Sequence, residues 1–259
     1  MPETYDVGHQ APPSPAAEMS EAGSLVNIFF EPGRTFEDLR RKPRWILGMI
    51  IIALLVTAYA FGISYKVGEA GMRRFIAEQL EKNPSTQALD PEAKANAIDL
   101  QVKIQSYTRY TIPVFVVIAM FIGGLLYFLG TKAFGGSGTF MQSLSVWVYS
   151  SIPPSVLAML GSFIVLAIKS ADEIDLATSQ RGLIQANPSM LIDGKAHPIL
   201  ATLIATVDVF MIWGWILAAI GLRITNRLSS GSAWGVVIII AVIGVLFRLL
   251  GAIFTGNPG

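Results

Sequence analysis

The sequence predicts an all-α membrane protein: a bundle of five transmembrane helices with a helical extracytoplasmic loop between the first two. Of its 259 residues, 53% are apolar and only 14% are charged, whereas a soluble domain carries about 25% charged residues. The apolar residues form five uninterrupted blocks, each long enough to cross a bilayer, which takes about 20 residues. The blocks are continuous rather than alternating, so they favour helices over the strands of a barrel.

Two regions follow from this pattern. Residues 1–22 are polar and contain four prolines, so they bury too little apolar surface to offset their ordering entropy, and we expect a disordered cytoplasmic tail. Residues 23–259 form one predicted membrane domain. Its spans cover about residues 45–65, 111–131, 143–168, 198–222 and 234–254, and the segments 66–110 and 169–197 form the outer loops.

A short apolar cluster precedes the first span and is too short to cross a membrane; it comprises Leu25, Val26, Ile28, Phe29 and Phe30. Two interpretations fit it: a helical foot at the membrane surface, or a segment packed on the protein itself. After it, Thr35 is suited to cap a short helix over residues 36–42, with Asp38 near the position of a capping box.

A basic collar comes directly before the first span. Five cations lie within eleven residues: Arg34, Arg40, Arg41, Lys42 and Arg44. By the positive-inside rule this end is cytoplasmic, which places the N-terminus inside and, after five spans, the C-terminus outside. The collar can also bind anionic lipid or a partner. The first apolar block is 21 residues long with 44 residues before it, which is too long for a cleaved signal peptide.

The first outer loop has a helical pattern. Met72, Phe75, Ile76 and Leu80 recur at helical spacing, and Asp90 followed by a proline is typical of a second helix start. We expect a small helical hairpin above the membrane, with a mobile loop as the alternative.

The second and third spans are joined by a glycine-rich run, Gly135 to Gly138. It lacks the Lys-Ser/Thr ending of a phosphate loop, so a tight cytoplasmic turn is the better interpretation. Within the third span, Pro153 and Pro154 follow Tyr149 and predict a helix break, because prolines leave backbone carbonyls without donors. Such breaks line binding sites in transporters, and they are also ordinary packing features.

Asp208 and Arg248 are the acid and the base that lie well inside the spans. Each is costly there unless paired or hydrated. Asp208 lies 14 residues from Leu222 and Arg248 lies 14 residues from Trp234, so antiparallel neighbours would bring them to one level. We predict an intramembrane ion pair. It can fix helix register, or serve a proton or substrate relay; alternatively Arg248 reaches the outer surface.

Enzyme chemistry has little support in the sequence. There is no Gly-x-Ser-x-Gly motif, the histidines are His9 in the tail and His197 in a loop, and the spans hold a single Asp. There are no cysteines and no metal-binding motif such as His-Glu-x-x-His. We therefore predict no catalytic residues, no metal site and no cofactor.

Three short patterns in this order resemble the Yip1 family of five-span membrane proteins, over residues 28–254. The first is Phe30-Glu31-Pro32-x-x-Thr35-Phe36. The second is the glycine turn leading to Tyr149-x-x-x-Pro153, and the third is Asp208 with Phe210 and Trp213, followed by Gly221-Leu222.

The resemblance implies a non-enzymatic membrane protein. Eukaryotic relatives bind small Rab-type GTPases in vesicle traffic, but this chain has a short N-terminal segment and lacks their Asp-Leu-Tyr-Gly-Pro motif. It is more similar to bacterial members, some of which resemble accessory factors of ABC-type efflux pumps. No catalytic or ligand residues carry over from the family.

We therefore expect a scaffold or accessory subunit for a membrane process such as ABC-type efflux or membrane traffic, in a bacterial inner membrane. The expected partners are the lipid bilayer and a membrane protein such as ABC transporter subunits, with a homo-oligomer as a further option and a small GTPase disfavoured. In the first outer loop the acidic and basic residues are nearly balanced, so no nucleic-acid patch is expected there, and no nucleic acid is expected as a partner. The alternative is a small transporter or channel with a polar site at Asp208, Arg248 and the Pro153-Pro154 break.

Overall fold

The computed structural model describes residues 19–82, 84–179, 182–184, 186–194 and 196–255, and all regular structure in these ranges is helical. Four helical stretches are long and apolar enough to cross a membrane: Ile46–Lys82 (α3), Pro91–Ala133, Phe140–Ile168 (α7) and Ser230–Phe254. A fifth crossing arises if α8 (Pro198–Ile204) and α9 (Val209–Thr225), bent by 46°, form one span. The all-α class predicted from the sequence is confirmed, and five spans agree with the structure.

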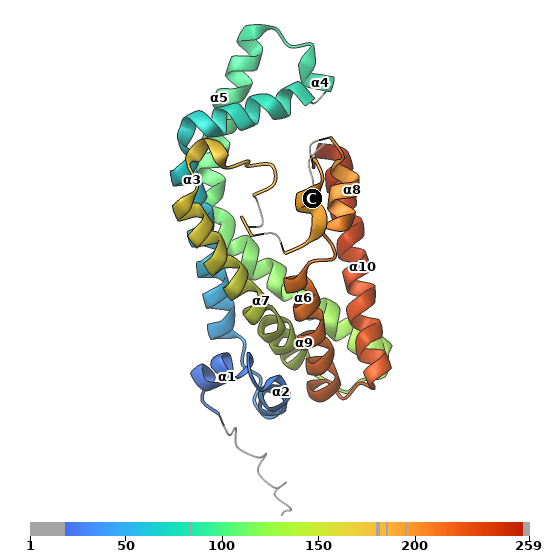
Figure 1. Ribbon diagram of the computed structural model, residues 1–259. Helices are drawn as coiled ribbons and strands as arrows, with labels where there is room; N and C mark the ends of the chain where they lie inside the picture. The colour runs from blue at the N-terminus through green and yellow to red at the C-terminus, as the bar shows by residue number, and fades with distance from the viewer. Residues whose placement is uncertain (1–18, 83, 180–181, 185, 195, 256–259) are drawn as a thin grey trace, which may run out of the picture.

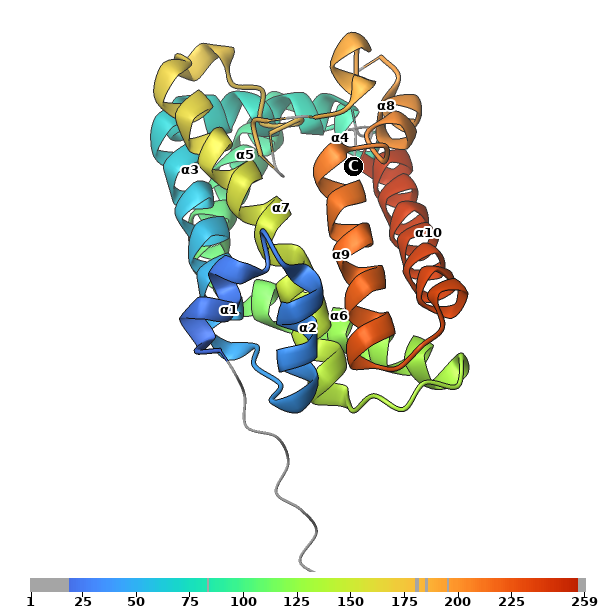
Figure 2. The same ribbon diagram turned by 60° about the horizontal axis from the view of Figure 1, so that its bottom comes forward.

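The long helices stand side by side around α7, which packs against α3, α9 and α6 (Ile112–Ala133). The helix α10 (Ser230–Thr255) lies beside α9 on the far side from α3 (Figures 1 and 2). The first two helices and the turns 134–139 and 226–229 gather at one end of the bundle, which we call the α1–α2 end. A helical hairpin occupies the opposite end, called the hairpin end.

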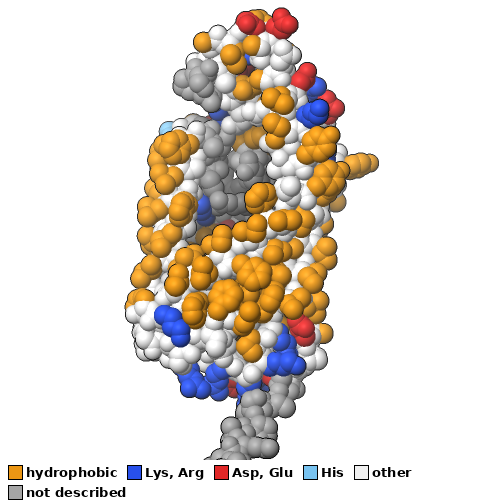
Figure 3. All heavy atoms as spheres, turned by 180° about the vertical axis from the view of Figure 1, so that it is seen from behind, with side chains coloured by type: hydrophobic (Ala, Val, Ile, Leu, Met, Phe, Trp, Pro, Cys, Tyr) orange, Lys and Arg blue, Asp and Glu red, His pale blue; other side chains and the backbone are white. Residues whose placement is uncertain are grey.

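The outer surface has the layout of a membrane protein. Figure 3 shows a broad apolar band along the flank, with Lys and Arg side chains gathered below it at the α1–α2 end. The exposed side chains of Tyr65 and Tyr110 lie near the opposite border, where interfacial aromatic residues are enriched.

The apolar cluster near the N-terminus combines both predicted arrangements. It lies in α1 (Glu21–Asn27) and the turn that follows. Leu25 and Ile28 are buried in the main core, whereas Val26 and Phe30 are 63% and 79% exposed. One face therefore packs on the protein and the other stays open. The sequence predicts a tail over residues 1–22. Residues 1–18 lie outside the described residues, and residues 21 and 22 belong to α1.

The next helix, α2 (Pro32–Arg41), begins earlier than the sequence suggested. Pro32 occupies its first turn, where the missing N–H costs nothing because no intrahelical acceptor exists there. Thr35 and Asp38 consequently lie inside the helix and are buried, so the predicted capping role of Thr35 is wrong. The Thr35 hydroxyl instead donates to the Glu31 carbonyl oxygen, at 3.2 Å.

The hairpin predicted between the first two spans is present as α3, α4 (Pro84–Gln87) and α5 (Pro91–Thr108), which a short turn, η1 (Arg109–Thr111), joins to α6. Gly68 bends α3 with a φ of +66°, a value that glycine adopts without strain. Asp90 caps α5 by accepting from Ala93 N at 2.7 Å. Ile76 and Leu80 of α3 are buried.

The glycine turn is shaped by Asn226, a residue that no sequence pattern singles out. Asn226 is fully buried, and its Nδ2 donates to Thr131 Oγ1 at 3.0 Å and to Ser143 Oγ at 2.6 Å. A Cβ at Gly136 would lie 2.9 Å from the Asn226 carbonyl oxygen, and one at Gly138 would overlap the Asn226 side-chain amide. The absence of side chains at Gly136 and Gly138 therefore makes room for the hydrogen bonds of Asn226.

We expect Gly138→Ala to destabilise the protein by about 1–3 kcal/mol, because the added methyl group overlaps a fully packed amide. Gly231→Ala is the matched control, since a Cβ there meets no atom within 4 Å. Thermal unfolding in detergent should show a lower midpoint for Gly138→Ala only. Equal midpoints for the two variants would contradict this account of the turn.

Candidate functional site

A cavity of about 780 Å³ lies between α7, α9, α10 and the segment that follows α7. Its deepest described residues, toward the α1–α2 end, are Tyr127, Trp147 and Val237. On α10 the lining runs from Val237 to Arg248, and eleven residues of helix correspond to about 16 Å. The cavity is therefore long and follows the helix axes.

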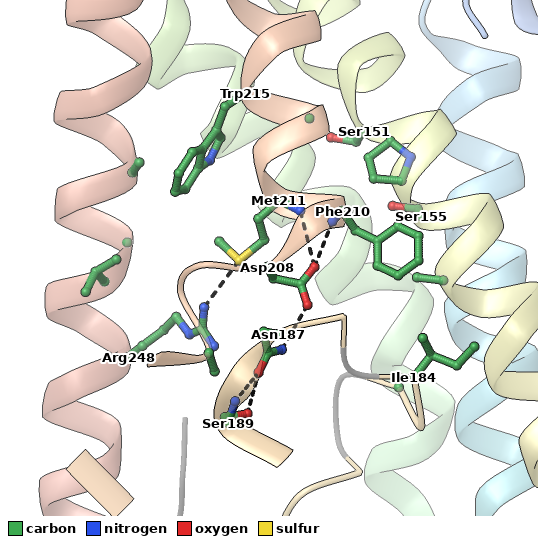
Figure 4. A pocket seen from close by; sticks show the side chains of 18 of the residues that line it. Ser151, Ser155, Ile184, Asn187, Ser189, Asp208, Phe210, Met211, Trp215 and Arg248 are labelled. Atoms are coloured by element: carbon green, nitrogen blue, oxygen red, sulfur yellow. Dashed lines mark hydrogen bonds between the residues drawn. The ribbon is translucent and has the colours of Figure 1, made fainter. Parts of the chain in front are cut away.

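The cavity wall changes in chemistry along its length. Trp147 and Tyr127 form an edge-to-face aromatic pair at its deep end, with ring centroids 4.8 Å apart. Hydroxyl groups of α7 follow, from Ser151 and Ser155. Figure 4 shows Trp215 on one side of Asp208, with Asn187, Ser189 and Arg248 toward the other. The polar groups thus gather toward the hairpin end.

Asp208 is the N-cap of α9. Its Oδ1 accepts from the backbone N–H groups of Phe210 and Met211 at 2.8 and 3.4 Å. Its Oδ2 accepts from Ala186 N at 3.1 Å and from Asn187 Nδ2 at 2.9 Å. A carboxylate at a helix N-terminus is also favoured by the helix dipole. One side chain therefore starts a helix and binds a loop.

This cap corrects the expectation of one continuous helix over residues 198–222. The stretch is divided into α8 and α9, with residues 205–208 between them. Asp disfavours helix interiors and favours N-caps because its oxygens bind nearby backbone N–H groups. The β-branched pair Thr206 and Val207 directly before Asp208 is a signal that could have revealed the break.

Arg248 lies on the wall of the same cavity as Asp208. It reaches α9 at Met211, where its Nη1 lies 3.5 Å from the thioether sulfur (Figure 4). The predicted ion pair between Asp208 and Arg248 stays a prediction. The observed contacts of Asp208 are with hydrogen-bond donors of α9 and of the preceding loop, which its carboxylate holds together.

Part of the loop 169–197 returns into the bundle, and we call residues 177–179, 182–184 and 186–187 the returning segment. Tyr59 of α3 donates its hydroxyl to Ser179 O at 2.7 Å, and Leu183 N donates to Ser162 Oγ of α7 at 3.0 Å. A Cβ at Gly161 would overlap Ile184, so this glycine admits the loop. Figure 1 shows the loop descending between the two groups of helices. It is thus not a purely external loop.

The predicted helix break at Tyr149, Pro153 and Pro154 is not present, because α7 continues from Phe140 to Ile168 through both prolines. The missing N–H groups of Pro153 and Pro154 leave the carbonyls of Tyr149 and Ser150 without their helical donors. The turn just before these carbonyls is reinforced by side chains. The hydroxyls of Ser150 and Ser151 donate to Trp147 O, at 3.1 and 2.8 Å.

Two residues of the predicted break, Pro154 and Tyr149, lie in different environments. Pro154 lines the cavity. A Cβ on Gly214 of α9 would lie 3.6 Å from both Pro154 and the Ser150 carbonyl oxygen, so α9 passes close there. Tyr149 is fully buried in the main core.

The five collar residues separate into two groups. Arg44 is buried, with its guanidinium 2.9 Å from both Asp38 Oδ2 and Ser24 Oγ. It connects α1, α2 and the start of α3, so it belongs to the core rather than to a surface. The remaining four keep more contact with solvent: Arg34 and Lys42 are exposed, and Arg40 and Arg41 are half-buried. Their lipid-binding role stays a prediction.

Comparison with known proteins gives two matches. The family model described as the Yip1 domain matches residues 26–253. The Bacillus subtilis (strain 168) protein named "Membrane protein YknW" is 27% identical over 248 residues, which cover 93% of this chain and 94% of that protein. No solved structure matches the chain significantly.

We expect Asp208→Ala to destabilise the protein by roughly 2–4 kcal/mol, because one substitution removes the acceptor of three backbone N–H groups and of the Asn187 side-chain amide. Asp90→Ala is the matched control: it removes the N-cap of α5, whose N–H groups can bind water, and should cost about 1 kcal/mol. The measurement is the thermal midpoint of each purified variant. Similar losses for both would show that Asp208 is an ordinary cap.

Proposed function

The chain belongs to the Yip1 domain family, and on this basis we propose that it is a non-enzymatic integral membrane protein that acts as a scaffold or accessory subunit. The process we propose is ABC-type efflux, because the chain lacks the Asp-Leu-Tyr-Gly-Pro motif of the trafficking members and has a bacterial relative. The Bacillus relative is named as a membrane protein, which supports the membrane role.

The observation that carries the accessory role is the hairpin, which stands clear of the bundle (Figure 1). It consists of helices that are joined by side-chain contacts. Arg73 of α3 binds Glu69 at 2.9 Å and Asp99 of α5 at 2.5 Å, and these hydrogen bonds raise the pKa of its guanidinium. This hairpin, which we call the arm, extends beyond the apolar band and is suited to contact a partner.

One face of this arm is apolar. Leu100, Ile104 and Tyr107 follow helical spacing on α5 and are 59%, 53% and 65% exposed. Water-facing apolar clusters of this kind typically mark interaction sites. Nearby residues hold mixed charge, so we propose a partner surface that is mainly apolar: the outer part of an ABC transporter subunit.

We further propose that the protein lies in a bacterial inner membrane with the α1–α2 end in the cytoplasm. The cations at this end support the proposal, because positively charged residues are retained inside. They include Arg34, Lys42, Lys132, Arg223 and Arg227. The arm then projects outward, where it meets external domains of a partner.

A second candidate function, a small transporter, is favoured by the cavity. It reaches Asp208, Arg248 and Pro154 within the bundle, as a substrate site near the middle of a membrane would. The two functions differ in whether the chain works alone or in a complex, so the same experiment separates them.

Gentle detergent extraction of the tagged chain from its native membrane should recover ABC transporter subunits in fixed proportion, as identified by mass spectrometry. We expect Ile104→Asp to abolish this recovery, because it places a carboxylate in the apolar face of α5. Gln105→Asp, also exposed on α5, is the control and should retain the partner. Recovery of the chain alone from wild-type membranes would contradict the accessory role and favour the transporter.

The orientation can be tested by single-cysteine labelling, since the chain contains no cysteine. Asn96→Cys on α5 should react with a membrane-impermeant maleimide in intact cells. Ser137→Cys, in the glycine turn, should react only after the membrane is permeabilised. Both positions are exposed, and the reverse pattern would invert the proposed topology.

A further inference from the structure

We propose that the cavity is a binding site for a single-chain amphiphile, with its apolar chain directed toward Trp147 and its polar head near Asn187, Ser189 and Arg248. This goes beyond the accessory role and does not depend on it. The inference rests on three properties of the cavity: its dimensions, its gradient of polarity and its place in the flank of the molecule.

The dimensions fit one chain. A volume of about 780 Å³ falls within the range of small-molecule sites, about 300–1,000 Å³. The lining of α10 extends about 16 Å from Val237 to Arg248. An extended chain advances about 1.2 Å per bond, so roughly 13 bonds cover this length. A chain of medium length therefore fits lengthwise.

The deep part of the cavity suits the apolar chain. Tyr127 and Trp147 close its end, and α10 contributes aliphatic and small residues to one wall. These are Val237, Ile240, Ala241, Gly244 and Val245. A chain in this position would remove apolar surface from water at both the ligand and the wall, which is the main favourable term in such binding.

The other end suits an uncharged or zwitterionic head group. Among the described lining residues, Asp208 and Arg248 carry opposite charges, so their sum is zero. Asn187 is held in place by donating to Asp208 and by accepting from Ser189 N at 3.0 Å. Oriented amide, hydroxyl and charged groups of both signs can bind a zwitterion without a net charge to neutralise.

The place of the cavity indicates the lipid layer as the route of entry. Figure 3 shows apolar side chains along this flank of the molecule, and α10 forms one wall of the cavity. The exposed residues of α10 at this level, Leu246, Phe247 and Leu250, are apolar and suited to lipid. An amphiphile in the bilayer already has its chain at the depth of the cavity, so it can enter sideways.

In this arrangement Asp208 is a positioning residue. It binds the returning segment to α9, and that segment supplies Asn187 at the polar end of the cavity. Its carboxylate therefore affects ligand binding through Asn187, whose side chain it holds in place.

The test uses a single-chain phosphocholine with a photoreactive diazirine at the end of its chain, and the purified full-length protein in nanodiscs. After irradiation, mass spectrometry should place the label on the deep lining around Trp147 and Val237. Gly244→Phe should reduce this label by roughly tenfold, because its ring would fill the cavity. A Cβ at Gly244 meets no atom within 4 Å, so the variant should fold.

Gly251→Phe is the matched control, one heptad along α10, where a Cβ also meets no atom within 4 Å. It does not line the cavity and should retain the label, with both variants showing the wild-type thermal midpoint. Label confined to lipid-facing residues such as Val242 and Leu246, or unaffected by Gly244→Phe, would overturn the proposal.

Two arms of the experiment distinguish the source of the amphiphile. The probe is either built into the nanodisc lipid or added later from the buffer, and faster labelling in the first arm supports entry from the bilayer. Labelling from the buffer alone would overturn the lateral route. The labelling experiment uses the isolated chain, so a negative result bears on the amphiphile site and not on the accessory role. A negative co-purification result likewise bears on the accessory role and not on the amphiphile site.

Discussion

The structure depends most on one constraint: in a bilayer, every backbone N–H and C=O must find its partner within the protein. Helices meet it by themselves. The stretch around Asp208 does not, because α8 and α9 are separate helices and the returning segment enters between α3, α7 and α9. Side chains supply the missing partners there: the Tyr59 hydroxyl, the Ser162 hydroxyl and the Asp208 carboxylate. Irregular backbone at membrane depth is tolerated where it lines a cavity, and the cavity lies beside it.

The same constraint accounts for the unequal ends of the bundle. At the α1–α2 end, Leu144, Leu222 and Asn226 are fully buried and fill the layer below the cavity. Asn226 closes that layer with hydrogen bonds to Thr131 and Ser143, and the glycine turn leaves room for it. The hairpin end is built from loops and a separate arm. The closed base and the open upper half therefore differ in how their polar groups are satisfied.

Arg44 shows how a charge pattern and a fold can use the same residue differently. Along the chain it is one of five cations ahead of a span, and this grouping indicates orientation. In the structure it is buried against Asp38 and Ser24. A buried pair of this kind contributes little as a charge at the surface, and breaking it by removing one partner is costly because the other charge stays buried. The foot formed by α1 and α2 is therefore attached to the bundle by an ion pair.

The helical class, the apolar blocks and the helical hairpin were readable from local pattern, because hydropathy and helix signals act over neighbouring residues. The same holds for the family, because each of its short patterns joins residues that lie close together in the chain. The site was readable only in part. Asp208 and Arg248 were recognised as unusual residues within spans, but the cap at Asp208 depends on Ala186 and Asn187, some 20 residues away, and Asn226 depends on Thr131 and Ser143. The close passage of α9 beside Pro154 at Gly214 likewise joins two separate segments, while α7 continues through Pro153 and Pro154. Such contacts join segments distant in the chain, so they arise from packing and leave no periodic signal.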